Sequence, residues 1–154
     1  MVIYRITKQR YKNILSGKGA EIYGGRWNSI GTPALYTSEN RALSVLELLV
    51  HTPKGILPPK YTILTLNVPA KFEDQIISIP RNKLPKNWNA LQPEVESMEI
   101  GDKYFTEFKT LGIIVPSTII KGENNIILNP IHVSFNEITI TTKLEVELDE
   151  RLLK

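Results

Sequence analysis

Several short stretches of the chain alternate between hydrophobic and polar residues with a period of two, which is typical of half-buried β-strands. The clearest alternation covers residues 61–68 and 133–141, and β-branched and aromatic residues predict another strand at 2–6. Shorter apolar runs predict further strands at 34–37, 76–79, 113–115 and 126–128. The chain should therefore contain more strand than helix.

Helical spacing is confined to three segments. Apolar residues recur every three or four positions between residues 39 and 50, and Ser38 is the expected N-cap of this helix. Helices are also predicted at 8–15 and 95–110, each ending shortly before a glycine. The two asparagines at 124–125 predict a turn. The segments follow one another without a repeat or a linker.

Composition fits one α+β domain over residues 1–154. The chain is 42% hydrophobic and 23% charged and has no cysteine, which excludes a disulfide scaffold and a zinc ribbon. No apolar segment approaches the ~20 residues that a transmembrane helix needs, so no membrane span is expected. Since cysteine and N-glycosylation sequons are both absent, we expect a cytoplasmic protein.

The net charge of +3 is unevenly distributed along the chain. Residues 1–71 carry ten Lys and Arg against three Asp and Glu, whereas the remainder carries nine against thirteen. A basic first half suits an anionic ligand, which is a nucleic acid, a dinucleotide or an acidic partner. Charge alone does not choose among these three.

Familiar metal and nucleotide motifs are missing. His51 and His132 are far apart in sequence and belong to no metal-binding signature, so no metal site is expected. The GKG at 17–19 lacks the order of a Walker loop, and no G-x-G-x-x-G follows a predicted strand. These absences disfavour P-loop and Rossmann enzymes.

A glycine-rich segment at 17–31 contains the first candidate functional residue. Arg26 directly follows Gly25 and its preceding glycine, where the backbone can approach a ligand closely. A guanidinium matches phosphate oxygens in pairs, so Arg26 is either a phosphate clamp or a surface ion-pair residue beside a tight turn. Trp27 is expected to pack in the core.

Glu47 is the second candidate, because it lies in the nearly all-apolar segment LSVLELLVH at 43–51. A buried carboxylate is costly unless it has partners. Glu47 therefore either belongs to a functional site or occupies a solvent-facing stripe with Ser44 and His51.

Ser117 is the third candidate, since it ends the apolar segment IIVPS at 113–117. Taken alone, a hydroxyl here is a turn or cap residue as readily as a functional group. The chain has no G-x-S-x-G motif, and no Ser-His-Asp arrangement can be assigned.

Taken together and in order, these pieces resemble the RES domain, a family named for Arg, Glu and Ser. The resemblance extends almost from end to end, and the series of motifs is far more specific than any one of them. The matching segments are YR at 4–5, GGRWNSIGTPALYTSEN at 24–40, LELLVH at 46–51, LPKNW at 84–88, GDKYF at 101–105, LGIIVPS at 111–117 and ENNIILNPIH at 123–132. Ser29-Ile30 and Tyr104 depart from residues common in the family, without touching a proposed catalytic group.

The resemblance implies a fold and a function. RES proteins are typically the toxins of bacterial toxin–antitoxin pairs, whose Xre-type antitoxin carries a helix-turn-helix DNA-binding region. They resemble ADP-ribosyltransferases in fold, which implies a single domain of mixed, mostly antiparallel sheets with a few flanking helices. They degrade NAD by hydrolysis or, in some members, by phosphorolysis. NAD is then the substrate, phosphate is a possible co-substrate, and no cofactor is expected.

The resemblance also gives roles to individual residues. Arg26, Glu47 and Ser117 become the catalytic residues, with Glu47 bonding the ribose hydroxyl and Arg26 assigned to the pyrophosphate or adjoining ribose. The residues expected to bind NAD are Arg5, Tyr36, Gly25, Asn129 and Lys18, with Tyr23 and His132 as weaker members of the pocket.

Two other functions remain open from the sequence. One is transfer of ADP-ribose to a protein, which needs the same pocket. The other is an RNA-directed toxin or nucleic-acid binder, although the basic residues are dispersed and no known RNA-binding pattern is present. The expected partners are NAD and an Xre-type antitoxin, with nucleic acid contacted only through the antitoxin and homo-oligomerisation possible.

Overall fold

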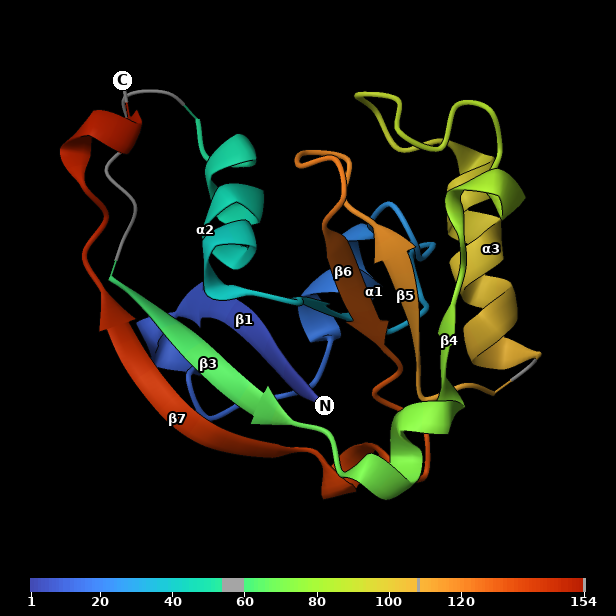
Figure 1. Ribbon diagram of the computed structural model, residues 1–154, viewed down its shortest axis with the longest axis horizontal. Helices are drawn as coiled ribbons and strands as arrows, with labels where there is room; N and C mark the ends of the chain where they lie inside the picture. Colours follow the sequence, from blue (N-terminus) through green and yellow to red (C-terminus); the bar gives the residue numbers. More distant parts are fainter. Residues whose placement is uncertain (54–59, 108, 154) are drawn as a thin grey trace.

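Seven strands form one sheet in the computed structural model, which describes residues 1–53, 60–107 and 109–153 (Figure 1). The sheet order is β4-β5-β6-β2-β1-β3-β7, and among these neighbours only β4 and β5 are parallel. The strands are β1 (Val2–Lys8), β2 (Leu35–Ser38), β3 (Tyr61–Asn67), β4 (Ile76–Ser78), β5 (Gly112–Pro116), β6 (Asn124–Leu128) and β7 (Thr139–Val146). The α-helices are α1 (Lys18–Tyr23), α2 (Arg41–Val50) and α3 (Val95–Thr106), and short 3-10 turns lie between elements and after β7. The predicted mixed, mostly antiparallel α+β fold is confirmed, with one sheet rather than several.

The sheet has two halves that meet at a narrow junction. β1, β3 and β7 form long antiparallel ladders in one half, and β2, β6, β5 and β4 form the other. One residue pair, Tyr4 with Ser38, joins β1 to β2. α2 contacts both of these strands, so the helix that carries Glu47 lies across the junction (Figure 1).

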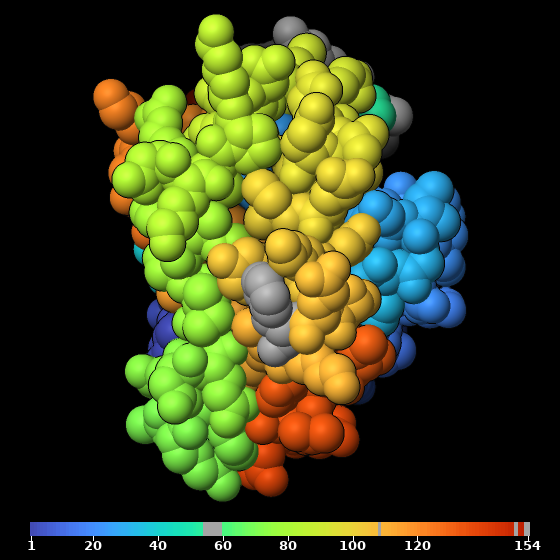
Figure 2. All heavy atoms as spheres, turned by 90° about the vertical axis from the view of Figure 1, so that its right-hand side faces the viewer, coloured from blue at the N-terminus to red at the C-terminus, as the bar shows by residue number. Residues whose placement is uncertain are grey.

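The core lies on both faces of the sheet. Because side chains alternate along a strand, Ile126 and Leu128 of β6 enter one cluster, while Ile127 between them enters the other. The first cluster contains Ile3 of β1 and Leu64 and Leu66 of β3. The second contains Trp27, Trp88 and Phe105, and it joins the glycine-rich segment to α3. Figure 2 shows the glycine-rich segment beside α3 on this side of the molecule.

The predicted helix at 8–15 is wrong. β1 continues to Lys8, where it pairs with Tyr61 of β3, and only a 3-10 turn follows at Gln9–Tyr11. Pairing with β3 along the whole of β1 outweighs the local helical pattern. The helix of this region is α1, which lies inside the glycine-rich segment and begins after Gly17 at a φ of 63°.

Four further expectations need correction, and two of them concern single residues or turns. Asn40, not Ser38, is the N-cap of α2: its side chain accepts a hydrogen bond from the Leu43 amide at 2.8 Å, while Ser38 belongs to β2. The asparagines at 124–125 begin β6 instead of forming a turn.

The two remaining corrections concern element boundaries. The strand expected at 133–141 is replaced by a 3-10 turn at Phe135–Glu137 and by β7, because Phe135 and Ile138 fold into the first core cluster. α3 ends at Thr106, short of the predicted residue 110, and residue 108 of that prediction lies outside the described residues. No helix of the described residues is long and apolar enough to span a membrane.

Candidate active site

Glu47 lies at the centre of a group of hydrogen-bonded side chains. It is half-buried on α2, and its Oε1 accepts hydrogen bonds from Ser117 Oγ at 3.3 Å and from Asn125 Nδ2 at 2.5 Å. The alternative of a solvent-facing stripe fails because Ser44 is buried, with its hydroxyl donating to the Arg41 carbonyl. The carboxylate is thus partnered, as burial requires.

Ser117 is a turn residue whose hydroxyl also contacts Glu47. Its Oγ accepts hydrogen bonds from the amides of Ile119 at 3.0 Å and Ile120 at 3.2 Å, which caps the turn after β5. Its amide donates to the Glu123 carbonyl at 2.8 Å, and its hydroxyl reaches Glu47. The turn therefore fixes the hydroxyl that the carboxylate uses.

Two Glu-Asn pairs fasten α2 to β6, and we call these four residues the Glu–Asn clasp. Glu39 accepts hydrogen bonds from the backbone amide of Asn124 at 2.7 Å and from its side chain at 3.0 Å. Asn40 in turn donates its side-chain amide to Glu123. The sequence analysis missed this clasp, although the repeated dipeptide Glu-Asn at 39–40 and 123–124 is a visible signal.

Arg26 is fixed by backbone carbonyls. Its Nη1 donates to the carbonyl of Trp88 and its Nη2 to the carbonyl of Ala90, both at 2.8 Å. Burial lowers the pKa of Arg26, and the charge of Glu47 and the phenol of Tyr36 oppose this shift. Arg26 is therefore an anchored cation within electrostatic reach of Glu47, rather than a surface ion-pair residue.

Tyr36 of β2 forms hydrogen bonds to the glycine-rich segment. Its hydroxyl donates to Asn28 Oδ1 at 2.8 Å and accepts from the Trp27 amide at 3.0 Å. Burial raises the pKa of this phenol. A Cβ at Gly25 would lie 2.8 Å from Tyr36 Cζ and closer still to its hydroxyl oxygen, so only glycine fits there.

Helix α3 also contacts the glycine-rich segment. The Ser29 amide donates to Asp102 at 3.0 Å. A Cβ at Gly101 would lie 2.7 Å from the carbonyl carbon of Trp27 and closer still to its oxygen. Trp27 itself is buried and stacks on Trp88 with ring centroids 6.3 Å apart, which confirms it as a core residue.

Arg5 links the two halves of the sheet. Its Nη1 donates to the Tyr36 carbonyl at 2.8 Å, whereas its Nε is buried without a hydrogen-bond partner. Burial lowers the pKa of Arg5 to about 10. A buried guanidinium with an unused donor is a place where a ligand oxygen gains a strong hydrogen bond.

The structure does not bring two predicted NAD-binding residues into this group. Asn129 is buried, and its amide nitrogen donates to the carbonyls of Phe105 and Thr110, near the end of α3. The exposed Lys18 forms an ion pair with Glu21 on α1 at 2.8 Å.

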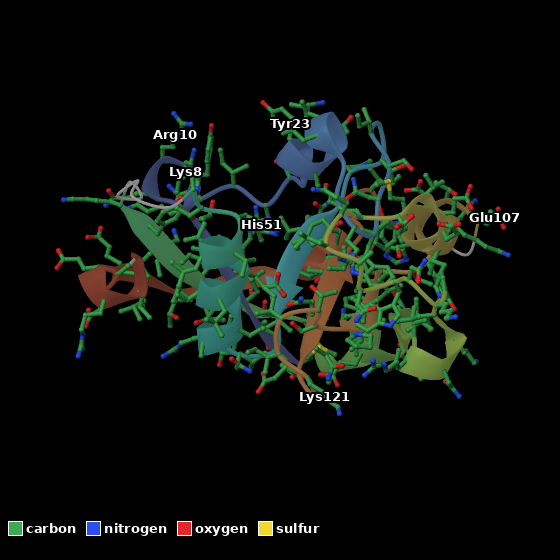
Figure 3. All side chains as sticks on the ribbon, turned by 90° about the horizontal axis from the view of Figure 1, so that it is seen from above. Lys8, Arg10, Tyr23, His51, Glu107 and Lys121 are labelled. Carbon is green, nitrogen blue, oxygen red and sulfur yellow. The ribbon has the colours of Figure 1, made fainter. Side chains whose placement is uncertain are left out.

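The two weaker candidates also lie outside the group. Tyr23 is 82% exposed and projects from α1 (Figure 3). His132 Nδ1 accepts a hydrogen bond from the Ser134 amide. The predicted residues that contacts and electrostatics connect are Arg5, Tyr36, Gly25, Arg26, Glu47 and Ser117. Within the described ranges, no cluster of three His, Cys, Asp or Glu side chains could hold a metal ion.

The order of the Arg, Glu and Ser motifs along the chain is that of a known family of proteins. The family model of the RES domain matches residues 2–149, and the chain belongs to that family. "Toxin Res" of Photorhabdus laumondii is 40% identical over 156 residues, covering 100% of this chain and 98% of that protein. "Toxin Res" of Yersinia enterocolitica is 33% identical and covers 99% of both chains.

Two further relatives extend the comparison. The "Prs ADP-ribosylating toxin" of a Sphingobium strain is 36% identical over 119 residues, covering 77% of this chain and 73% of that protein. A solved structure, the MbcT-MbcA toxin–antitoxin complex of M. tuberculosis, has a chain of the same fold, with a TM-score of 0.72. That match has 17% identity and covers 94% of this chain and 83% of the other.

Proposed function

We propose that this protein is the toxin of a toxin–antitoxin pair and that it degrades NAD by cleaving the bond between nicotinamide and ribose. The observation that supports this most is the Glu47 carboxylate, half-buried and hydrogen-bonded, with the anchored cation Arg26 within electrostatic reach. Two relatives matched over almost their full length are named as toxins, and a third, matched over 73% of its length, is named an ADP-ribosylating toxin; these names support the same class of activity.

The chemistry needs one carboxylate. When the bond from C1′ to the nicotinamide nitrogen breaks, its electron pair neutralises the cationic ring, so the leaving group needs no proton. Ordinary glycosidases use a second carboxyl group to protonate their leaving oxygen. Glu47 would accept a hydrogen bond from a ribose hydroxyl and offset the positive charge that develops at C1′.

The arginines would bind the anionic part of the substrate. Burial lowers the pKa of both Arg26 and Arg5, and the buried Nε of Arg5 has no hydrogen-bond partner. Pyrophosphate oxygens are suitable partners for such guanidinium groups. Tyr36, whose hydroxyl is hydrogen-bonded to the glycine-rich segment, would present its ring to nicotinamide.

The oxygen that attacks C1′ belongs to water, phosphate or a protein. This acceptor oxygen loses its proton as the new bond forms. The relative named an ADP-ribosylating toxin favours transfer to a protein as the second candidate function. We further propose an Xre-type antitoxin as the partner, since a structure of the same fold is a toxin–antitoxin complex. The proposed compartment is the cytoplasm.

The test is to incubate the protein with NAD, in the presence and in the absence of phosphate, and to measure the released nicotinamide by chromatography. Glu47→Gln keeps the shape of the side chain but removes its charge, so turnover should fall at least ~100-fold, as for loss of a group that stabilises transition-state charge. Glu137→Gln, an exposed site in the turn at Phe135–Glu137, is the matched control and should keep full turnover. If purified wild-type protein leaves NAD intact under every condition, with and without a candidate protein acceptor, the proposal is wrong.

A further inference from the structure

We propose that Asn125, held by Ser38, is a positioning residue that locks one oxygen of Glu47 and leaves the other for the substrate. The inference rests on the proposed function, because it says how the Glu47 carboxylate is aimed. The sequence analysis assigned neither residue a catalytic or substrate-binding role.

The geometry is a chain of two hydrogen bonds across neighbouring elements. Ser38 Oγ donates to Asn125 Oδ1 at 2.8 Å, and Asn125 Nδ2 donates to Glu47 Oε1 at 2.5 Å. Ser38 and Asn125 are directly opposed in the β2–β6 ladder, and Ser38 is buried. Two strands therefore fix the position of the amide, and α2 brings the carboxylate to it.

The Ser38 hydroxyl decides which way the amide faces. Asn has one acceptor and one donor end, and a carboxylate can use only the donor end. A hydroxyl proton bound to Oδ1 keeps Nδ2 turned toward Glu47. Without Ser38, Asn125 would lose the contact that opposes rotation of its amide.

Ser117 acts on the same carboxylate oxygen. Its Oγ already accepts from the amides of Ile119 and Ile120, so its single proton is left for Glu47 Oε1. Both side-chain donors that the described residues give to Glu47 thus reach Oε1, and none reaches Oε2. Oε2 is the oxygen that remains for a ribose hydroxyl.

The charged surroundings of Glu47 make the arrangement testable by pH. Arg26 lies within electrostatic reach of Glu47 from the glycine-rich segment, and His51 follows one turn later at the end of α2 (Figure 3). Asn125 and Ser117 are neutral. Replacing Asn125 by Asp keeps the shape but removes the donor and adds a second carboxylate beside Glu47.

The experiment compares Asn125→Asp and wild type by kcat, KM and the pH profile of NAD cleavage. Two adjoining carboxylates resist ionising together, so the acid limb of kcat should move upward by about one pH unit or more. At neutral pH kcat should fall roughly 10- to 100-fold, as expected for a lost hydrogen bond to a charged group, with little change in KM. Asn13→Asp is the control, because it makes the same charge change at an exposed site where Lys143 Nζ donates to Asn13 Oδ1 at 2.5 Å. Its kcat, KM and pH profile should match those of wild type.

Ser38→Ala is the second variant, and it keeps Asn125 in place while releasing its amide. It should lower kcat several-fold, as for one neutral hydrogen bond, without moving the acid limb. An unchanged acid limb in folded Asn125→Asp would overturn the proposal, as would wild-type kcat in Ser38→Ala if Asn125→Asp does not fold.

A substrate-free readout separates this inference from the proposed function. The carboxyl carbon of Glu47 is assigned by NMR from the signal that Glu47→Gln loses, and it is then titrated in wild type and Asn125→Asp. Glu47 should ionise at higher pH in Asn125→Asp, and an identical titration would overturn the positioning role. If wild type fails to cleave NAD, the proposed function fails, while this titration still decides whether Asn125 controls Glu47.

Discussion

The two charged groups at the centre of the site are held in different ways. Arg26 donates to two backbone carbonyls, and its segment leaves no space for an added carbon atom, because α3 approaches it at Gly101 and the Tyr36 ring approaches it at Gly25. Glu47 belongs to a helix that is fastened by polar side chains, through the Glu–Asn clasp and the donors Ser117 and Asn125.

This difference predicts which substitutions destabilise each region. Close packing tolerates loss of a polar atom better than gain of a carbon atom, because the backbone has no room to move. A network of charged and amide groups reacts in the opposite way, since the shape can be kept while a donor or a charge is lost. Variants that add an atom to one region and remove a donor from the other therefore test the comparison.

The largest effect is expected from Gly101→Ala. The new Cβ would overlap the Trp27 carbonyl, so α3 and the glycine-rich segment must separate, at a cost of about 3 kcal/mol of unfolding free energy. Urea unfolding followed by tryptophan fluorescence measures this, since Trp27 and Trp88 lie at the contact.

Gly19→Ala is the matched control, because it makes the same substitution in a helix. Gly19 lies in α1, and a Cβ there would meet nothing within 4 Å. This variant should be more stable than wild type by roughly 0.5–1 kcal/mol. Equal effects of the two alanines would show that helix propensity, rather than packing at Gly101, decides the outcome.

A smaller effect is expected where the polar region is cut, at Asn40. Asn40→Ala removes the N-cap of α2 and the amide that reaches Glu123, which should cost about 1–2 kcal/mol of unfolding free energy. Thermal unfolding measures the loss. Asn136→Ala, at an exposed position, should stay within ~0.5 kcal/mol of wild type.

Asn40→Asp separates the two roles of this side chain. The carboxylate can still cap α2, but it faces Glu123 without a donor. Its stability should approach that of wild type as acid protonates one of the two carboxyl groups. If Asn40→Asp were as stable as wild type at neutral pH, the contact with Glu123 would contribute nothing and the clasp would reduce to a helix cap.

The sequence predicted the two regions unequally. Arg26, Glu47 and Ser117 were proposed as site residues because their motifs occur in family order, and most strands were predicted correctly because their apolar residues alternate. The Glu–Asn clasp and Asn125 were missed because a polar residue in a strand gives no sign of its partner until the strands are placed side by side. The helix expected at 8–15 failed for a related reason, since pairing between β1 and β3 is a long-range contact.

The smallest effect is expected from Tyr36→Phe, which removes a polar contact from the packed region. The ring stays, but the hydrogen bonds to Trp27 and Asn28 are lost, so we expect a cost of about 1 kcal/mol at pH 8. Because burial raises the pKa of Tyr36, the folded protein keeps this proton at pH values where the unfolded chain loses it. Wild-type stability should therefore fall above about pH 10, by about 1.4 kcal/mol per pH unit from this group, and the gap to Tyr36→Phe should narrow.

Urea unfolding of both proteins between pH 8 and pH 11 measures that gap, with Tyr23→Phe as the control at an exposed phenol. A gap that stays constant would mean that burial does not raise the pKa of the Tyr36 phenol in the folded protein. A gap much larger than 1 kcal/mol at pH 8 would contradict the comparison itself, because the Arg26 region would then depend on a hydrogen bond as strongly as the Glu47 region does. A small difference in unfolding free energy that narrows as the pH rises would show that the Tyr36 hydrogen bonds contribute little to a region stabilised mainly by packing.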